Sequence, residues 1–359
     1  MTAGRTALIV GAGLAGARCA ETLRAEGFDG RVVLVGDESV PPYERPALSK
    51  ELLAGTRTAE RLALRPRQFW AEKEITLVLG HRVRWIDSRR GIAVVDDGSP
   101  LHWDDLVLAT GARPRRLPFQ SPPGVHELRT LADAVALKKE LEAARRLVVV
   151  GGGFVGTEVA STARSLGVEV VLIEAGDTPF ASVLGPEVGS ILARRYRAHG
   201  VELRTKAAAA GFRVNGSGRV SAVELVDATV IPCDVVLVAI GVEPERELAP
   251  AAPGARLAGD AAGGPGHWTS AAADGGAAAR RVLGLDPLPA PVPFFWSDQF
   301  GLRIQLVGDT RGAQAVELDG PEGEFLARYR GKDGRLAAAL AANRPADVRT
   351  LRHELALAA

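Results

Sequence analysis

The segment GAGLAG has the glycine spacing of a dinucleotide-binding turn. Gly11 permits the tight turn after a strand, Gly13 lets the backbone approach a pyrophosphate, and Gly16 lets helix and strand pack closely. The pyrophosphate would sit at the helix N-terminus, where unpaired N–H groups point at it. Asp37 and Glu38 follow about twenty residues later, where an acid binds ribose hydroxyls. Glycines, helix and acid together predict a nucleotide site.

A second segment, GGGFVG, places Gly151, Gly153 and Gly156 in the same roles. Glu174 ends the strand that follows. An acidic side chain there accepts hydrogen bonds from a free 2′-hydroxyl and repels a 2′-phosphate, which favours NADH over NADPH. Two alternatives stay open: arginines elsewhere could neutralise a phosphate, and Glu174 could be an ordinary solvated acid.

Each turn needs a strand before it and a helix and strand after it. An apolar run at Thr6–Val10 precedes the first turn, helical periodicity follows, and a second apolar run covers 32–35. The same order recurs from 147–150 through a helix to 168–173. The repeat predicts an α/β fold with two Rossmann-type domains and two nucleotide sites.

The rest of the chain gives the domain boundaries. Buried-strand patterns at 104–109 and 234–240 run into Gly111 and Gly241 and indicate crossings between domains. After the proline-rich stretch 287–293, Leu302, Ile304 and Leu306 alternate with polar residues, which predicts a half-exposed antiparallel sheet. A closing helix is expected over 346–359, with Leu351, Leu355 and Leu357 at helical spacing. The predicted domains are an FAD-binding domain (1–112 and 243–289), an NAD-binding domain (113–242) and a C-terminal α+β domain (290–359).

Composition narrows the function classes. A net charge of +1 over 359 residues gives no general electrostatic case for binding nucleic acid or membranes, although Arg113, Arg115 and Arg116 could serve as local docking points. No apolar stretch is long enough for a membrane span or a signal peptide, so a cytoplasmic location is expected. The two cysteines, Cys19 and Cys233, form no dithiol or metal-binding motif, and no metal site is predicted.

Several segments together resemble the FAD-dependent ferredoxin reductases of oxygenase systems, a glutathione-reductase-like group related to apoptosis-inducing factor. The resemblance covers nearly the whole chain and is carried by GAGLAG, VGDESVPPYERPALSK, LATGARP, LRTLADA, GGGFVGTE and FWSDQFG. The stretch ERPALSK, residues 44–50, is the most specific to this family, because many enzymes share the Rossmann turns.

The resemblance assigns FAD to the first turn and the nicotinamide coenzyme to the second. The FAD contacts it implies are Gly11, Gly13, Leu14, Ala15, Gly16, Asp37, Glu38, Arg45, Lys50, Val83, Ala109, Thr110, Gly111, Arg129, Gly259, Asp260 and Trp268. The NAD contacts are Gly151, Gly153, Phe154, Val155, Gly156, Glu158, Glu174 and Gly241. For Arg129 an exposed arginine at a helix start is the alternative.

Three residues are expected at the reacting centre. Lys50 and Glu158 match a pair that the family brings together beside the flavin, one from each nucleotide domain, to position nicotinamide against flavin N5. Trp296 matches a residue that the family places over the flavin, and a core tryptophan is its alternative. An ordinary surface lysine and a helix glutamate are the alternatives for the pair.

The route of the electrons follows from a missing residue type. Disulfide reductases of similar architecture need a cysteine beside the flavin, and residues 41–50 contain none. An external acceptor is therefore expected. The resemblance implies a 2Fe-2S ferredoxin, with rubredoxin as a variant, serving a cytochrome P450 or a ring-hydroxylating oxygenase, and a monomer or homodimer. Rival functions are an NADH-dependent reductase of a quinone or dehydroascorbate, and a redox-sensing flavoprotein.

One region departs from the family pattern. The stretch 249–258 before Asp260 is short and rich in alanine and proline, and 261–266 is also trimmed, with Gly266 where an acid is common. We expect these losses, which lie beside Asp260 and Trp268, to lower the affinity for FAD or to open its site to solvent.

Overall fold

The computed structural model describes residues 4–264 and 266–358, and the chain forms two compact units. Unit 1 comprises Met1–Glu44, Glu60–Arg113 and Glu243–Pro291. Unit 2 comprises Arg45–Ala59, Pro114–Val242 and Val292–Ala359. The chain therefore crosses between the units five times, and two of these crossings fall within strands β8 (Ala112–Pro114) and β17 (Val242–Pro244), which pair with each other.

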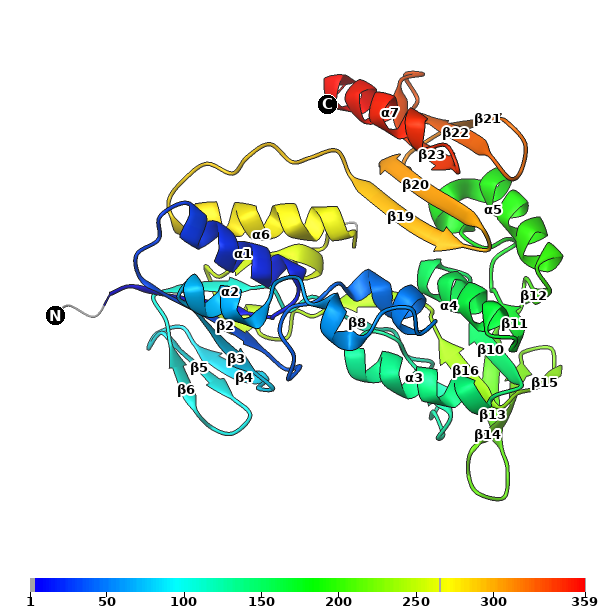
Figure 1. Ribbon diagram of the computed structural model, residues 1–359, viewed down its shortest axis with the longest axis horizontal. Helices are drawn as coiled ribbons and strands as arrows, with labels where there is room; N and C mark the ends of the chain where they lie inside the picture. Colours follow the sequence, from blue (N-terminus) through cyan, green and yellow to red (C-terminus); the bar gives the residue numbers. More distant parts are fainter. Residues whose placement is uncertain (1–3, 265, 359) are drawn as a thin grey trace. The chain divides into compact units, whose positions relative to one another are not determined.

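Unit 1 is built on a five-stranded parallel sheet of order β18-β7-β1-β2-β3. Helices α1 and α6 lie side by side (Figure 1) and cover one face, and a three-stranded antiparallel sheet, β4-β5-β6, covers the other. Both faces are covered, so β1 is buried along its whole length, as expected for a parallel sheet. The strands are β1 (Thr6–Val10), β2 (Arg31–Gly36), β3 (Ile75–Leu79), β4 (Val83–Asp87), β5 (Ile92–Val95), β6 (Pro100–His102), β7 (Asp105–Leu108) and β18 (Arg256–Leu257). The helices are α1 (Leu14–Ala25), α2 (Arg67–Glu72) and α6 (Trp268–Val282), with short turns η3 (Ala59–Leu62), η4 (Ala249–Ala251) and η5 (Gly259–Ala262).

Unit 2 repeats this plan around a parallel sheet of order β12-β11-β10-β16-β9. Helices α3, α4 and α5 cover one face, and the antiparallel sheet β13-β14-β15 covers the other. The strands are β9 (Val125–His126), β10 (Arg146–Val150), β11 (Glu169–Ile173), β12 (Val201–Arg204), β13 (Ala209–Val214), β14 (Val220–Leu225), β15 (Val230–Pro232) and β16 (Val235–Val238). The helices are η1 (Arg45–Ala47), η2 (Leu48–Leu52), α3 (Leu131–Ala143), α4 (Phe154–Ser165) and α5 (Ala181–Ala198). The predicted α/β class and both β-α-β repeats are confirmed.

The C-terminal part of unit 2 is an antiparallel sheet of order β19-β20-β23-β22-β21 with one helix. Its elements are β19 (Phe294–Gln299), β20 (Leu302–Gly308), β21 (Ala315–Asp319), β22 (Phe325–Arg330), β23 (Leu336–Ala342) and α7 (Pro345–Ala358). The alternation predicted at Leu302, Ile304 and Leu306 is confirmed, because all three side chains are buried and Arg303 is exposed. The prediction of a half-exposed sheet is wrong, because both faces of the sheet are covered by helices.

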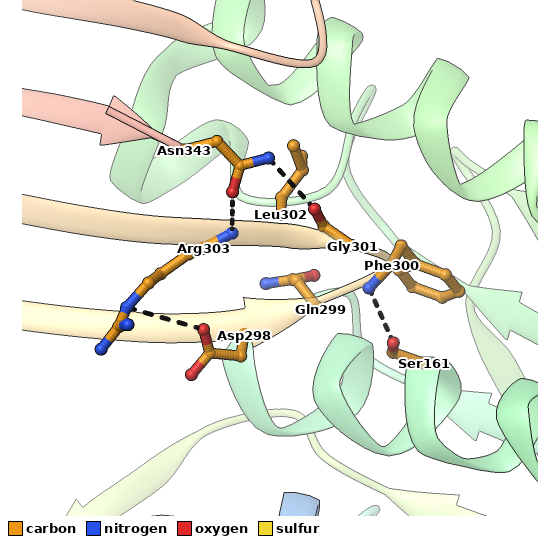
Figure 2. Close-up of a pocket in the computed structure, with 8 residues that line it drawn as sticks. All are labelled: Ser161, Asp298, Gln299, Phe300, Gly301, Leu302, Arg303 and Asn343. Atoms are coloured by element: carbon orange, nitrogen blue, oxygen red, sulfur yellow. Dashed lines mark hydrogen bonds and ion pairs between the residues drawn. The ribbon is translucent and has the colours of Figure 1, made fainter. Parts of the chain in front are cut away.

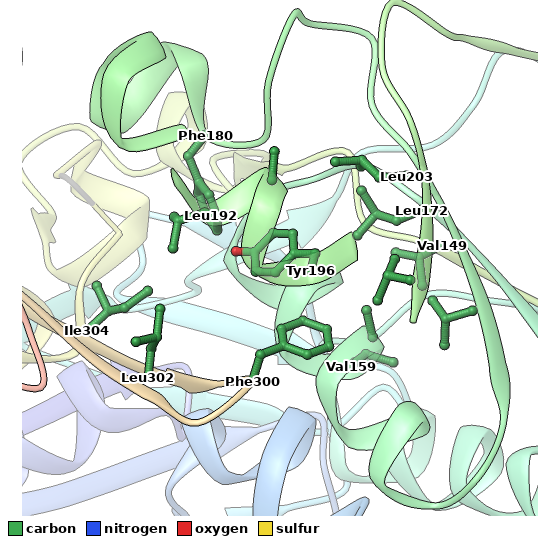
Figure 3. Packing of buried hydrophobic residues seen from close by; sticks show 14 of the residues in the cluster. Val149, Val159, Leu172, Phe180, Leu192, Tyr196, Leu203, Phe300, Leu302 and Ile304 are labelled. Carbon is green, nitrogen blue, oxygen red and sulfur yellow. The ribbon is translucent and has the colours of Figure 1, made fainter. Parts of the chain in front are cut away.

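The two faces of this sheet pack against different helices. One face packs on α7 through Leu351 and Leu355. The other shares a single hydrophobic core with helix α5 and its Tyr196, as Figure 3 shows. The closing helix is confirmed as α7, which includes Leu351, Leu355 and Leu357, and Ala359 lies outside the described residues. Leu357 is 76% exposed and is no part of the core.

None of the helices within the described residues combines the length and the apolar character that a membrane crossing requires.

Candidate active site

The first glycine turn forms an open cradle at the start of helix α1. A Cβ on Gly11, whose φ is +115°, would lie 2.1 Å from the carbonyl oxygen of Ala109, and one on Gly16 would lie 2.0 Å from that of Gly11. Gly13 caps the helix without a side-chain hydrogen bond, and nothing lies within 4 Å of its Cβ position. The first N–H groups of α1 are thus left for an outside acceptor, and the space in front of them suits a pyrophosphate.

The second turn repeats this geometry before helix α4. A Cβ on Gly151 would lie 2.3 Å from the carbonyl oxygen of Ala239, and one on Gly156 would lie 2.1 Å from that of Gly151. Gly153 caps α4 without a side-chain bond and also faces open space. Gly241 has a φ of +104°, and its carbonyl accepts from the backbone of Arg115. Both cradles fit the phosphates of a dinucleotide.

The predicted ribose acids differ in their surroundings. Asp37 is 63% exposed and lies 3.8 Å from Arg82, while Glu38 Oε2 accepts a hydrogen bond of 2.8 Å from Tyr43. Glu174 is bound at both oxygens: Oε2 accepts from the backbone N–H of Gly152 at 2.8 Å and Oε1 from that of Gly176 at 2.6 Å. The carboxylate of Glu174 therefore stabilises the backbone at Gly152, in the second glycine turn, and at Gly176. The sequence did not predict these contacts.

The remaining predicted FAD positions of unit 1 lie on several elements. Leu14 and Ala15 begin α1, and a Cβ on Gly259 would lie 2.8 Å from the Cβ of Ala15. Asp260 follows in η5, and Trp268 is the first residue of α6. Elsewhere in the unit, Ala109, Thr110 and Gly111 follow β7, and Val83 begins β4 with 6% exposure.

Arg45, Lys50 and Arg129 belong to unit 2. The Arg45 guanidinium donates to the carbonyl oxygen of Arg129. Arg129 is half-buried and precedes Thr130, which caps α3 in a reciprocal arrangement with Asp133. The helix-start position considered for Arg129 is thus correct, although the residue is not fully exposed.

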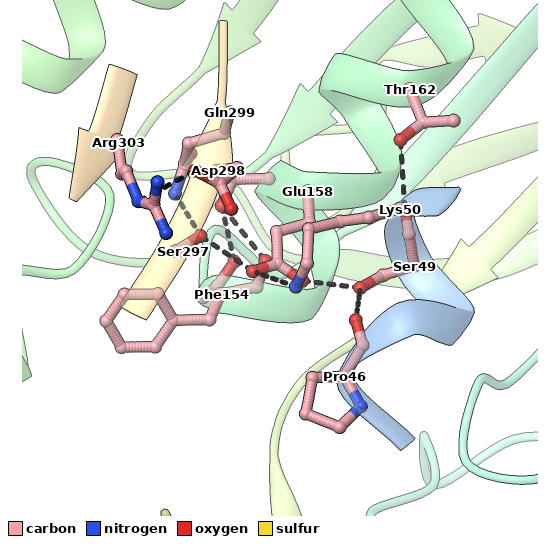
Figure 4. Close-up of polar contacts among 12 residues, drawn as sticks. Pro46, Ser49, Lys50, Phe154, Glu158, Thr162, Ser297, Asp298, Gln299 and Arg303 are labelled. Atoms are coloured by element: carbon pink, nitrogen blue, oxygen red, sulfur yellow. Dashed lines mark hydrogen bonds and ion pairs between the residues drawn. The ribbon is translucent and has the colours of Figure 1, made fainter. Parts of the chain in front are cut away.

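Lys50 and Glu158 are paired. Nζ of Lys50 lies 3.0 Å from Oε1 of Glu158, and their side chains are 11% and 6% exposed (Figure 4). Lys50 lies in η2, a short π-helix, a local distortion frequent at functional sites, and Glu158 lies on α4 beyond the coenzyme cradle. Both residues belong to unit 2, because the segment 45–59 packs there through Leu53.

Further polar groups surround Glu158. Ser297 on β19 donates to Oε1 at 2.7 Å, and Ser49 donates to Oε2. Thr162 on α4 donates to the carbonyl of Ser49 at 2.9 Å, which fixes η2 against the helix. The carboxylate thus has partners on both oxygens, which is what stabilises a buried charge. Ser49, Thr162 and Ser297 were not predicted, since isolated serines and threonines carry no spacing signal.

Two aromatic positions flank this region. Trp296 precedes Ser297 on β19, lies half-buried opposite Gln305, and stacks on Phe294 at 6.1 Å. Phe154, at the start of α4, contacts Phe180 and Phe295 with ring centroids 4.6 and 4.0 Å away. Val155 beside it is 40% exposed.

A separate recess of about 360 Å³ lies at the turn between β19 and β20 (Figure 2). Its lining consists of Ser161, Asp298, Gln299, Phe300, Gly301, Leu302, Arg303 and Asn343, none of them a predicted site residue. The polar groups here bind one another: Ser161 accepts from the N–H of Phe300, and Asn343 accepts from that of Arg303. The recess is therefore explained by the packing of the turn.

Neither cysteine is placed for thiol chemistry. Both are free and buried, with Cys19 0% and Cys233 7% exposed. Burial raises the pKa of each thiol to about 12, which keeps it protonated and a poor nucleophile.

Comparison with known proteins decides the family. Residues 5–264 match the pyridine nucleotide-disulphide oxidoreductase family, and residues 294–359 match a reductase C-terminal family. The chain belongs to this oxidoreductase family. The ferredoxin--NAD(+) reductase component of the biphenyl dioxygenase system of Paraburkholderia xenovorans (strain LB400) is 38% identical, covering 94% of this chain and 90% of its own. Putidaredoxin reductase of Pseudomonas putida is 35% identical, covering 97% and 90%.

Solved structures agree. The covalent putidaredoxin reductase–putidaredoxin complex matches with a TM-score of 0.93 at 33% identity, over 99% of this chain and 93% of that chain. The ferredoxin reductase for the CYP199A2 system from Rhodopseudomonas palustris matches with a TM-score of 0.89 at 32% identity, over 96% and 92%. The predicted resemblance is confirmed, and the chain is an oxidoreductase. FAD and NADH are the cofactors that this family and its NAD(+)-dependent relatives imply.

Proposed function

We propose that this protein transfers hydride from NADH to FAD and then passes single electrons to a 2Fe-2S ferredoxin of a P450 or ring-hydroxylating oxygenase system. The observation that carries the proposal is the ion pair between Lys50 and Glu158, buried just beyond the second cradle. The names of the relatives support the ferredoxin as acceptor. The cytoplasm is part of the proposal, because an enzyme that consumes NADH needs a compartment that supplies it.

The two cradles divide the cofactors. FAD binds at Gly13 in the domain formed by 1–112 and 243–289, and NADH binds at Gly153 in the domain 113–242, next to the C-terminal domain 290–359. Bound FAD supplies the redox chemistry by accepting a hydride and releasing electrons singly. Asp37 contacts the adenosine ribose of FAD, and Glu174 contacts that of NADH.

The chain's own residues supply orientation and electrostatic control. Glu158 and Lys50 hold opposite charges in a site with little exposure, where electrostatic interactions are stronger than in water. This pair fixes the approach of the nicotinamide ring, and such positioning accounts for a large share of many enzymatic rate enhancements. Trp296 is assigned to the path of the electrons toward the acceptor.

Hydride transfer from NADH to FAD, the first step of the proposal, can be tested by following flavin absorbance in an anaerobic stopped-flow instrument. Protein loaded with FAD should be bleached by NADH, and Glu158→Gln should lower the limiting rate about tenfold by removing the charge that Lys50 faces. Protein that takes up FAD and is not bleached by NADH would contradict the proposal.

Electron transfer to a ferredoxin, the second step of the proposal, can be tested by following the reduction of cytochrome c. With NADH present, reduction should depend on an added 2Fe-2S ferredoxin, with putidaredoxin as the first probe. Rapid reduction of a quinone together with no response to ferredoxins would identify a small-molecule reductase instead.

A further inference from the structure

A chain of hydrogen bonds leads from the hydrophobic core of unit 2 to the carboxylate of Glu158. Tyr196 on α5 donates its hydroxyl proton to Oε1 of Gln299 at 2.6 Å. Nε2 of Gln299 donates to Oγ of Ser297 at 3.0 Å, and Ser297 donates to Oε1 of Glu158 at 2.7 Å. Figure 4 shows the end of this chain, where Ser297 meets the carboxylate.

Every member of the chain is buried. Tyr196 and Ser297 are 0% exposed, Gln299 is 3% exposed and Glu158 is 5% exposed. A polar group in such a place costs free energy unless it is hydrogen-bonded, so each link depends on its neighbour. The surrounding core is apolar, and leucine or phenylalanine would fill these positions without that requirement.

The Tyr196 end of the chain is a neutral hydroxyl. Burial raises the pKa of Tyr196, so its hydroxyl keeps its proton. That proton is donated to Oε1 of Gln299, and the NH₂ group of the same amide faces Ser297. Ser297 has one proton, and since its oxygen accepts from Gln299, that proton is available for Glu158.

We propose that Ser297 and Gln299 are positioning residues for hydride transfer. They hold the Glu158 carboxylate charged and facing Lys50, and Tyr196 sets the orientation of Gln299. Both residues come from the C-terminal segment, so this segment takes part in the chemistry of the coenzyme site as well as in packing. The inference rests on the proposed role of Lys50 and Glu158.

The test is a double-mutant cycle read out by flavin reduction. Ser297→Ala should lower the limiting rate of flavin reduction by NADH about tenfold, because a hydrogen bond to a charged group is lost, and should leave the dissociation constant of NADH within about twofold. In the Glu158→Gln background, Ser297→Ala should cause no further slowing, because its effect passes through the carboxylate. Each variant is first checked for FAD content and circular dichroism.

Tyr196→Phe supplies a milder variant that removes one oxygen atom and frees the Gln299 amide to turn. It should slow flavin reduction about threefold. Tyr329→Phe is the matched control, because that hydroxyl is also buried but donates to the carbonyl of Leu184, away from Glu158. The control should reduce its flavin at the wild-type rate.

The outcomes separate the two proposals. If Glu158→Gln itself reduces flavin at the wild-type rate, the proposed function of the ion pair fails. If Glu158→Gln is slow while Ser297→Ala and Tyr196→Phe are as fast as wild type, the positioning role is overturned. Equal slowing by Ser297→Ala in both backgrounds would also overturn it, since that pattern indicates a general loss of structure.

Discussion

The two hydrogen bonds to Glu174 give this residue a structural task beside its proposed task in coenzyme choice. Glu174→Gln removes the charge that would repel a 2′-phosphate and puts an NH₂ group opposite one of the two N–H donors, Gly152 or Gly176. We expect the ratio of kcat/KM for NADPH to that for NADH to rise about tenfold. The free energy of unfolding should fall by about 1–3 kcal/mol, because one buried donor loses its acceptor.

Steady-state kinetics with both coenzymes and thermal unfolding measure the two effects. Glu169→Gln is the control, because it makes the same charge change at the opposite end of β11, where the residue is exposed and pairs with Arg146. An unchanged coenzyme ratio in Glu174→Gln would remove the specificity role and leave the loop contact alone.

The two cysteines should be unreactive toward thiol reagents in the folded enzyme. Since burial raises the pKa of Cys19 and Cys233 to about 12, neither supplies thiolate near neutral pH. Iodoacetamide at pH 8 should label neither thiol in the native protein and both in guanidinium chloride, as counted by mass spectrometry. NADH-dependent flavin bleaching should survive the treatment. Loss of bleaching on labelling would point to a thiol in the reaction.

The sequence predicted those site residues that stand in motifs. Lys50 lies in ERPALSK and Glu158 in GGGFVGTE, and their contact is confirmed. Ser49 and Ser297 were missed although Ser49 also stands in ERPALSK and Ser297 stands in FWSDQFG. Their importance depends on burial and on a partner 109 or 139 positions away, which no local pattern encodes.

At the scale of elements, helix α6 approaches helix α1 closely at Gly275. A Cβ on Gly275 would lie 2.1 Å from the carbonyl oxygen of Ala15, a backbone atom that cannot give way cheaply. Gly275→Ala should lower the free energy of unfolding by about 2–3 kcal/mol through overpacking. Ala15 is a predicted FAD contact, so the ratio of bound FAD to protein should fall as well.

Gly276→Ala is the matched control one residue along the same helix. Its Cβ would lie 3.6 Å from Oγ1 of Thr22, an ordinary contact, and alanine favours a helix by about 1 kcal/mol over glycine. This variant should be as stable as wild type or more so, with full FAD content. Equal behaviour of the two variants in thermal unfolding and FAD absorbance would show that the close approach is not needed.

Element boundaries were predicted where hydrophobic periodicity is strong. The expected strand at 104–109 is β7 (Asp105–Leu108), and that at 234–240 is β16 (Val235–Val238). The π-helix η2 was not predicted, because its conformation depends on Leu53 packing with α3 and on Thr162 binding Ser49. The short stretch before Asp260 keeps one strand, β18, paired with β7, so the parallel sheet is retained there.

At the scale of the whole molecule, the internal repeat in the sequence predicted the common plan of the two units. Each unit has a parallel sheet between helices and a small antiparallel sheet. The shared core of α5 and the C-terminal sheet could not be predicted from the sequence, because the apolar patterns of β20 and β22 do not identify the helix that covers them. That helix is determined by the packing of segments that lie more than a hundred residues apart in the sequence.

Because α5 and the C-terminal sheet share one core, we expect them to unfold cooperatively. Phe325 on β22 is 1% exposed and belongs to the same cluster as Leu192 and Tyr196 of α5. Phe325→Ala should lower the free energy of unfolding by about 3–5 kcal/mol. Native-state hydrogen exchange should show faster exchange in α5 as well as in β22, because the two elements lose protection as one unit.

Leu357→Ala is the control, because Leu357 on α7 is 76% exposed. This variant should change neither the free energy of unfolding nor the exchange rates. If exchange in Phe325→Ala accelerates in β22 while α5 keeps wild-type protection, the C-terminal sheet opens independently, and its donor to Glu158, Ser297, would be lost without unfolding the coenzyme domain.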